Sequence, residues 1–250
     1  MDSNINRTDE QNFLDHYDPK AFAPMAVTVD TVVFGITKRA SGNYRKLDNQ
    51  KLNILLVKRD NYPFKGCYSL PGGFVWQDET LEQTVSRVLK SKTGLKHIFC
   101  EQLYTFGAVD RDPRMRVVSC AYIALIDTEM AKINGAEWFS MEEIASLSLA
   151  FDHNNLIEEA LKRLRGKINY TDIIFHMMPK RFTISELQEV YEIILGKKLL
   201  PAAFRRFISD RIQETDEFTK DAGHRPSRFY KVKDLQIEDN KDLHCSNKEM

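Results

Sequence analysis

The chain has 250 residues, of which 42% are hydrophobic and 29% charged, enough apolar side chains for one large or two small globular domains. Its mean hydropathy is -0.42 and no apolar run approaches the roughly 20 residues needed to cross a bilayer, so we expect no membrane span. The N-terminal segment 1–18 is polar and lacks the apolar stretch of a signal peptide. Four cysteines without a C-x-x-C pair favour reduced thiols, and hence a cytoplasmic protein.

The charge is unevenly divided along the chain, although 36 basic residues balance 36 acidic ones. Residues 161–233 carry 16 Lys and Arg against 9 Asp and Glu, whereas residues 1–160 carry 18 against 22. A basic block after an acidic one suggests a C-terminal module that meets phosphates. Clustered charge is more often only a solvated face, so this observation needs support from the fold.

The first 150 residues are predicted to mix strands and helices. Strands are expected where Val, Ile, Phe and Thr are concentrated, over residues 25–36, 52–58, 98–107 and 116–126. A helix is expected over residues 79–93, because apolar residues recur there at helical spacing and Gly94 follows as a stop. The glycine-rich turn at 71–73 precedes this helix, and a polar insert at 37–50 separates the first two strands.

The C-terminal part is predicted to contain two short helices and a hairpin. Thr183 and Glu186 form a capping box, and Gly196 ends the helix that they begin. Pro201 begins the second helix, whose predicted buried stripe is Phe204, Phe207, Ile208 and Ile212. Two strands with basic residues near their turn are expected over 212–232. Helix, turn, helix and basic hairpin together predict a winged helix.

A longer motif starts at the glycine-rich turn. Its spacing resembles the Nudix box, G-x5-E-x7-R-E-U-x-E-E-x-G-U, in which U is a bulky aliphatic residue. The matching residues are Gly73, Glu79, Arg87, Leu89, Gly94 and Leu95. The three glutamates of the R-E-U-x-E-E core fall instead on Val88, Ser91 and Lys92. In the family those carboxylates share one helix face and hold the divalent ions that neutralise a pyrophosphate and activate water.

These departures change the expected chemistry. An apolar side chain, a hydroxyl and an ammonium replace three carboxylates, so a hard divalent cation is expected to be repelled. We therefore expect no catalytic residue, no metal site and no cofactor, and Nudix hydrolysis that is lost or very weak. Metal binding elsewhere stays open, because four acidic residues remain: Glu79, Glu82, Glu101 and Asp110.

Further segments resemble a narrower group, the Nudix-related transcriptional regulators of the NrtR and AraR kind. They are residues 106–113, 116–119 and 151–153 in the first part, and 179–183, 204–206 and 225–230 in the second. The resemblance runs from about residue 26 to residue 233 and implies an α+β fold, a Nudix α/β/α sandwich with a mixed sheet followed by a winged helix-turn-helix.

Another helix is expected where apolar residues recur at helical spacing, at Leu156, Ala160, Leu161 and Leu164. We expect four parts, with a boundary after Gly166, where this helical pattern is lost. They are an N-terminal arm (1–24), a Nudix-like effector-sensing domain (25–166), a winged-helix DNA-binding domain (167–235) and a disordered polar tail (236–250).

The resemblance implies a ligand-responsive regulator that binds a palindromic double-stranded DNA operator as a homodimer, with half-sites about 34 to 36 Å apart. Its effector would be a sugar or an ADP-ribose-like metabolite, since arginines clamp diphosphates and carboxylates accept sugar hydroxyls. The expected effector-binding residues are Arg59, Gly72, Gly73, Arg87, Asp110, Arg111, Asp112, Arg116, Asp152 and His153. The expected DNA-binding residues are Arg205, Arg206, Ser209, Arg225 and Arg228.

Arg87 and His153 also have purely structural interpretations. The role of Arg87 could be limited to pairing with Glu79, and that of His153 to starting a helix. The main alternative function is an ADP-ribose or sugar-nucleotide pyrophosphatase with an appended winged helix. It would need unconventional metal ligands such as Glu79 with Glu82. A pure interaction module would leave the C-terminal arginines unexplained.

Overall fold

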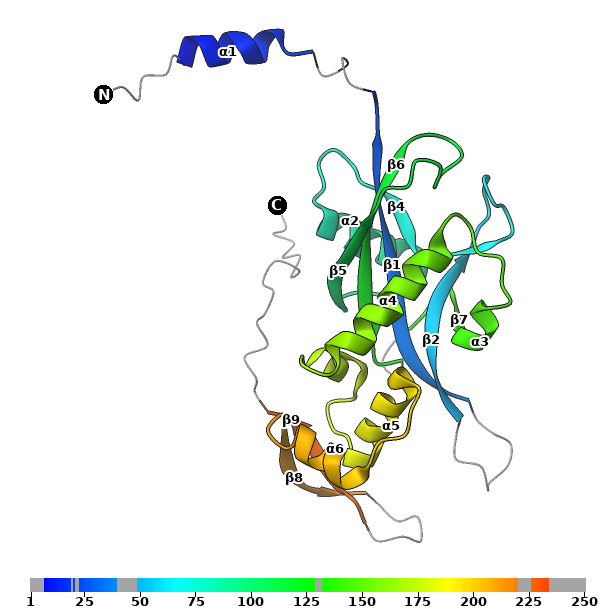
Figure 1. The fold of residues 1–250 in the computed structure, drawn as a ribbon, viewed down its shortest axis with the longest axis vertical. Helices are drawn as coiled ribbons and strands as arrows, with labels where there is room; N and C mark the ends of the chain where they lie inside the picture. Colours follow the sequence, from blue (N-terminus) through cyan, green and yellow to red (C-terminus); the bar gives the residue numbers. More distant parts are fainter. Residues whose placement is uncertain are drawn as a thin grey trace.

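The computed structural model describes residues 7–18, 20, 23–39, 49–128, 132–219 and 226–233. A mixed sheet with helices on both faces forms the larger part, and a smaller unit of helices and a hairpin lies at one end of it (Figure 1). Arg225, the tail 236–250 and most of the predicted insert 37–50 lie outside the described residues. Within those described ranges, no helix is long and apolar enough to span a bilayer.

The described strands of the larger part form one 7-stranded sheet with the path β3-β2-β1-β6-β5, and β4 and β7 pair with β1 and β2. Strand β1 is central, since it runs antiparallel to β2 and β4 and parallel to β6. The bounds are β1 (Ala26–Arg39), β2 (Asn49–Lys58), β3 (Tyr68–Ser69), β4 (Gly72–Phe74), β5 (Phe99–Phe106), β6 (Val117–Ile126) and β7 (Glu137–Ser140). The four predicted strands are confirmed as β1, β2, β5 and β6. The first two are longer than predicted, because they pair with each other as far as Arg39 and Asn49.

Helices cover both faces of the sheet, because side chains of β1 alternate between two cores. Val29 and Val33 pack on one face with Val88 of α2 (Leu81–Thr93). Val32 and Phe34 pack on the other face with α4 (His153–Lys167) and α5 (Ile184–Leu195). The short helix α3 (Met141–Ile144) follows β7. Helix α1 (Arg7–His16), which was not predicted, lies apart from the sheet (Figure 1).

The predicted helix 79–93 begins later than expected. Thr80 is its N-cap, with a capping box to Gln83, and Glu79 precedes the helix. The predicted stop is confirmed, since Gly94 has a φ of 76° and its N–H donates to Lys90 O. A left-handed residue at this position favours glycine.

The smaller unit contains the predicted helix, turn, helix and hairpin. It consists of the 3-10 helix η2 (Ile173–Met177), α5, α6 (Pro201–Ile208), β8 (Ile212–Phe218) and β9 (Arg228–Val232). The capping box at Thr183 and the C-cap at Gly196 are confirmed. The predicted burial of Phe207 is wrong, since this residue is 39% exposed. Phe204 and Ile208 lie four positions apart on the inner face of α6, so Phe207 falls at its flank.

The two units share one hydrophobic core. Leu164 of α4, Ile174 of η2 and Phe204 of α6 belong to the same buried cluster as Val32 of β1. Helix α4 ends at Lys167, one residue after the predicted boundary at Gly166. This packing holds the smaller unit directly against the sheet (Figure 1).

Candidate functional site

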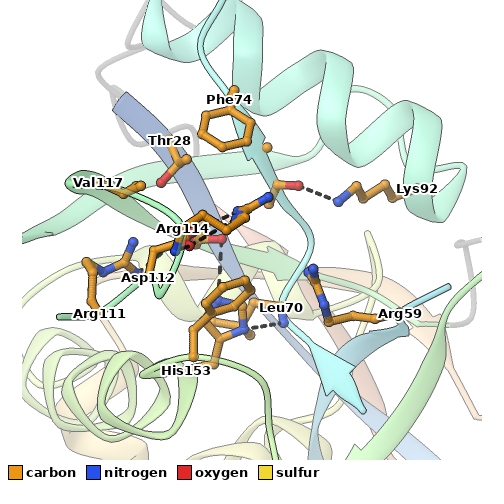
Figure 2. Close-up of a pocket in the computed structure, with 14 residues that line it drawn as sticks. Thr28, Arg59, Leu70, Phe74, Lys92, Arg111, Asp112, Arg114, Val117 and His153 are labelled. Carbon is orange, nitrogen blue, oxygen red and sulfur yellow. Dashed lines mark hydrogen bonds and ion pairs between the residues drawn. The ribbon is translucent and has the colours of Figure 1, made fainter. Parts of the chain in front are cut away.

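A cavity of about 200 Å³ opens where β1, β4, the end of α2 and the start of α4 meet (Figure 2). Eight of its 14 lining residues have polar or charged side chains. The lining residues are Thr28, Asp30, Arg59, Leu70, Gly72, Gly73, Phe74, Lys92, Arg111, Asp112, Arg114, Val117, Phe151 and His153. Cations outnumber carboxylates, so the cavity suits an anionic ligand.

Two glycines form the floor of the cavity because side chains would not fit there. A Cβ added to Gly72 would lie 1.9 Å from Asp30 Oδ1, and one added to Gly73 would lie 2.9 Å from Val88 Cγ2. Only glycine therefore lets β4 pass between β1 and α2. The close approach brings the Gly72 carbonyl within reach of Lys92, whose Nζ donates a hydrogen bond to it.

Asp30 is the acidic centre of the site and was not predicted. Its side chain is 10% exposed and accepts a hydrogen bond of 2.6 Å from Ser119 Oγ. Arg111 Nη2 and His153 Nε2 each lie 3.6 Å from its carboxylate oxygens. The sequence did hold a signal, because Asp30 stands within an otherwise apolar and Thr-rich strand, where a carboxylate needs partners.

Arg111 joins the loop after β5 to the start of α4. Its Nε and Nη2 donate to Asp152 at 3.0 and 2.7 Å, and its side chain is 3% exposed. Asp152 itself does not line the cavity but lies directly before α4, where the helix dipole favours a negative charge.

His153 links the turn between β3 and β4 to the start of α4. Leu70 N donates to its Nδ1 at 2.9 Å, so the ring proton of the neutral form is on Nε2, facing Asp30. Burial of the ring lowers the pKa of His153 below its ordinary value. The neutral ring therefore serves as a hydrogen-bond acceptor for the backbone beside the glycine floor.

Two cations of the cavity, Arg59 and Lys92, have no direct ion-pair partner among the described residues, although Asp30 acts electrostatically on both and Asp112 acts on Arg59. Arg114 donates to both oxygens of Asp112, at 3.0 and 2.7 Å, and these hydrogen bonds lower the pKa of Asp112. Within the described part of the chain, Arg59 and Lys92 form no ion pair. Arg59 Nε donates to Pro63 O at 2.9 Å, and its guanidinium lies 4.8 Å from the centre of the Phe151 ring.

Lys92 as a whole residue is exposed, but crowding at the cavity partly desolvates its ammonium group and lowers its pKa. Thr28 adds a neutral group, since its hydroxyl is buried without a hydrogen-bond partner among the described residues. The cavity thus offers two cations and a hydroxyl that a ligand could engage.

Four predicted effector-binding residues do not line this cavity, namely Asp152, described above, and Arg87, Arg116 and Asp110. Arg87 hydrogen bonds to Glu79 at 2.6 and 2.8 Å and lies 3.7 Å from the centre of the Trp76 ring. Arg116 donates to Ala108 O at 2.7 Å, and Asp110 is exposed. Arg87 stands five positions before Lys92, about 140° away around the helix, so the two side chains face different directions.

The replaced positions of the Nudix box have three different surroundings. Val88 is 1% exposed within the core under α2, and Ser91 Oγ donates to Val88 O at 3.2 Å, whereas Lys92 reaches the cavity. The remaining acidic residues are dispersed: Glu79 pairs with Arg87, Glu82 accepts from Tyr122, Glu101 pairs with Lys167, and Asp110 is exposed. In the described ranges, no group of three His, Cys, Asp or Glu side chains is placed to hold a metal ion.

The predicted DNA-binding residues that the structure describes lie on α6, directly after it, and on β9. Arg205 and Arg206 are exposed, and Ser209 follows the helix, its hydroxyl donating to Arg206 O at 2.9 Å. No side-chain partner of either arginine is found among the residues that the structure describes. Arg228 on β9 is paired with Glu214 of β8, and its guanidinium lies 5.2 Å from the centre of the Phe218 ring.

Two family models match the chain in the expected order. The NUDIX domain matches residues 38–160, and the NrtR DNA-binding winged helix domain matches residues 174–232. Together with the sheet and helices described above, these matches confirm the predicted α+β fold of a Nudix domain followed by a winged helix.

A curated relative, the ADPR responsive transcriptional repressor NtrR of Acinetobacter baylyi, is 38% identical over 240 residues, which are 92% of this chain and 91% of the relative. The crystal structure of Shewanella oneidensis NrtR complexed with a 27mer DNA is 36% identical, with a TM-score of 0.71 over 83% of this chain and 93% of that chain. The NUDIX domain of Shewanella oneidensis NrtR, complexed with ADP ribose, is 40% identical, with a TM-score of 0.51 over 62% of this chain and 98% of that chain.

These likenesses extend through both parts of the chain and fit a regulator, not the alternative hydrolase. The chain therefore belongs to the family of Nudix-related transcriptional regulators of the NrtR kind, DNA-binding proteins whose Nudix domain binds a small metabolite.

Proposed function

We propose that the chain is a transcriptional repressor that responds to ADP-ribose, which binds in the cavity above the Gly72-Gly73 floor. The observation that carries this proposal is that Arg59 and Lys92 both line that cavity without a direct ion-pair partner among the described residues, which suits a diphosphate. The relatives named for ADPR and ADP ribose support the choice of ligand.

The cavity would hold only part of this ligand. Its volume of about 200 Å³ is below the roughly 300–1,000 Å³ of most small-molecule pockets. We place the diphosphate at Arg59 and Lys92, and one ribose beside Thr28 and Asp112, with the rest of the ligand outside. Arg111, Asp152 and His153 then act as the frame that positions these groups.

The Nudix domain is proposed to bind its ligand without hydrolysing it. Val88 is buried where the box has a glutamate, and Lys92 brings positive charge to the cavity. Both changes oppose a cluster of divalent cations, so a bound effector would persist as a signal.

At the DNA end, we propose that α6 enters the major groove with Arg205, Arg206 and Ser209, and that Arg225 and Arg228 meet phosphates. Glu214 already engages Arg228, so this arginine should contribute less than an unpaired one. A homodimer on a palindromic operator, a cytoplasmic location and the division at residues 24, 166 and 235 belong to the same proposal.

The test uses the full chain and a duplex from upstream of its own gene, followed by fluorescence anisotropy. We expect nanomolar binding that ADP-ribose reverses and free ribose does not, because only the former carries a diphosphate. A parallel thermal-shift titration should show a higher Tm with ADP-ribose, since a ligand that binds the native state stabilises it. No Tm shift, or DNA binding that ADP-ribose leaves unchanged, would contradict the proposal.

A further inference from the structure

We propose that the cavity is a metal-free diphosphate site in which the Lys92 ammonium supplies the positive charge that a divalent cation would otherwise bring. This inference rests on the proposed function, because it takes the ligand to be a diphosphate. The inference identifies Lys92 as a residue that binds the diphosphate. It also states that this binding does not need Mg²⁺.

The packing of α2 aims Lys92 at the cavity. Val88 and Leu89 are buried under the helix, and Lys92 stands four and three positions after them, above the same face. The glycine at position 73 lets β4 approach Val88 closely, which brings the Gly72 carbonyl to the Lys92 ammonium (Figure 2). The carbonyl thus fixes the direction of the ammonium group.

The donors of Lys92 are only partly used. An ammonium has three N–H donors, and the hydrogen bond to Gly72 O occupies one. Arg59 lies in the same cavity and uses its Nε on Pro63 O, while its Nη atoms have no hydrogen-bond partner among the described residues. Two cations with donors to spare can meet the two charged oxygens of a diphosphate diester.

The carboxylates of the cavity are already engaged. Asp112 accepts two hydrogen bonds from the Arg114 side chain, and Asp30 accepts one from Ser119 and faces Arg111. A hard divalent cation prefers several free oxygen ligands and is repelled by nearby ammonium and guanidinium groups. The same charges that attract a bare diphosphate therefore exclude a metal ion.

The test measures ADP-ribose binding to the full chain by isothermal titration calorimetry, once with EDTA and once with Mg²⁺. We expect equal affinities within about twofold for the wild type. Lys92→Gln keeps an amide that can donate to Gly72 O but removes the charge, and should weaken binding by about 10- to 100-fold, the range of a charge-assisted hydrogen bond. The matched control is Lys90→Gln on the exposed side of α2, which should bind as the wild type does.

Two further variants separate charge from folding. Lys92→Arg should retain binding in EDTA, and Lys92→Glu should lose it and regain part of it with Mg²⁺ or Mn²⁺, because a carboxylate is a metal ligand. Circular dichroism and Tm verify that each variant is folded; if Lys92→Gln is not, the contrast between Lys92→Arg and Lys92→Glu decides.

The outcomes are distinguishable from failure of the proposed function. Wild-type binding that requires Mg²⁺, or equal affinity of the folded Lys92→Gln and Lys90→Gln proteins, would overturn this inference and leave ADP-ribose as the effector. Absence of binding in both buffers would overturn the proposed function, and the inference with it.

Discussion

Arg111 donates two hydrogen bonds to Asp152, at 3.0 and 2.7 Å, and these join the cavity to the N-cap of α4. The far end of α4 reaches the winged helix, where Arg165 Nε donates to Ile194 O of α5 at 2.8 Å. One helix of 15 residues thus has the cavity at one end and the DNA-binding unit at the other. A ligand that changes the position of Arg111 would act directly on this helix.

The Arg111–Asp152 pair should be important for stability. Asp152→Ala would leave a guanidinium that is 3% exposed with only the more distant Asp30, at 3.6 Å. Breaking a buried pair by removing one partner costs about 3–5 kcal/mol, which urea denaturation would measure. The control is Glu142→Ala in the exposed Lys51–Glu142 pair, for which about 0–1 kcal/mol is expected. Equal losses in the two variants would contradict the structural role of the buried pair.

The pH dependence of stability should reflect His153. Burial lowers its pKa below the ordinary value of 6.5, so the unfolded chain binds a proton that the folded chain rejects. The contribution of the neutral His153 ring to the free energy of unfolding is therefore complete above the ordinary pKa. It declines as the pH falls from that value through the lowered pKa of the folded protein. We expect a lower free energy of unfolding at pH 5.5 than at pH 7.5.

His153→Asn tests this assignment, because the Asn carbonyl can accept the hydrogen bond from Leu70 N but does not titrate. The variant should have a flatter dependence of stability on pH over this window. Burial also lowers the pKa of His176, which is half-buried. His176→Asn is therefore the matched comparison. A pH dependence that His153→Asn leaves unchanged would show that the ring does not titrate as described.

Local signals in the sequence were sufficient for the longer strands and for α2, α5 and α6, but not for α1 or the short elements β3, β4, β7, α3 and η2. Thr183 with Glu186, Gly94 and Gly196 define helix ends through backbone geometry that each segment carries by itself. The direction in which a helical side chain points is not predictable from such local signals, because it depends on how the helix is rotated against the sheet. The ability of arginine to clamp a diphosphate predicts Arg87 as a cavity residue, whereas the packing of Val88 turns Lys92 towards the cavity instead.

The acidic centre of the site was missed for a similar reason. Asp30, Ser119 and His153 are far apart in the sequence, and only the parallel pairing of β1 with β6 and the docking of α4 bring them together. A single carboxylate in a strand gives no indication of which partners will surround it. The exposed position of Phe207 likewise depends on tertiary packing, since its spacing alone fits a buried stripe.

Hydrolysis of ADP-ribose with Mg²⁺ or Mn²⁺ should be below about 1 s⁻¹, the low end of the usual enzymatic range. The reason is that two of the three replaced box positions are a buried valine and a cation at the cavity. Formation of AMP, followed by chromatography, measures the rate, and a catalytically competent ADP-ribose pyrophosphatase serves as the positive control. Steady turnover above that rate would restore the hydrolase alternative.

DNA binding should depend most on the exposed arginines of α6. Arg205→Ala and Arg206→Ala each remove a cation that has no side-chain partner in the described structure, whereas Arg228→Ala removes one already paired with Glu214.

Loss of a phosphate contact should flatten the plot of log affinity against log salt by about 0.9, and loss of a guanine contact should cost about 1 to 3 kcal/mol on the cognate duplex only. We therefore expect the α6 variants to lose more affinity than Arg228→Ala, with anisotropy titrations at several salt concentrations as the measurement. Lys162→Ala on α4 is the control, since this lysine is 80% exposed and its ion pair is with Glu159 of the same helix, at 3.7 Å. If the folded Arg205→Ala, Arg206→Ala and Arg228→Ala triple variant keeps the affinity and salt slope of the control, α6 and the hairpin do not contact DNA through these residues.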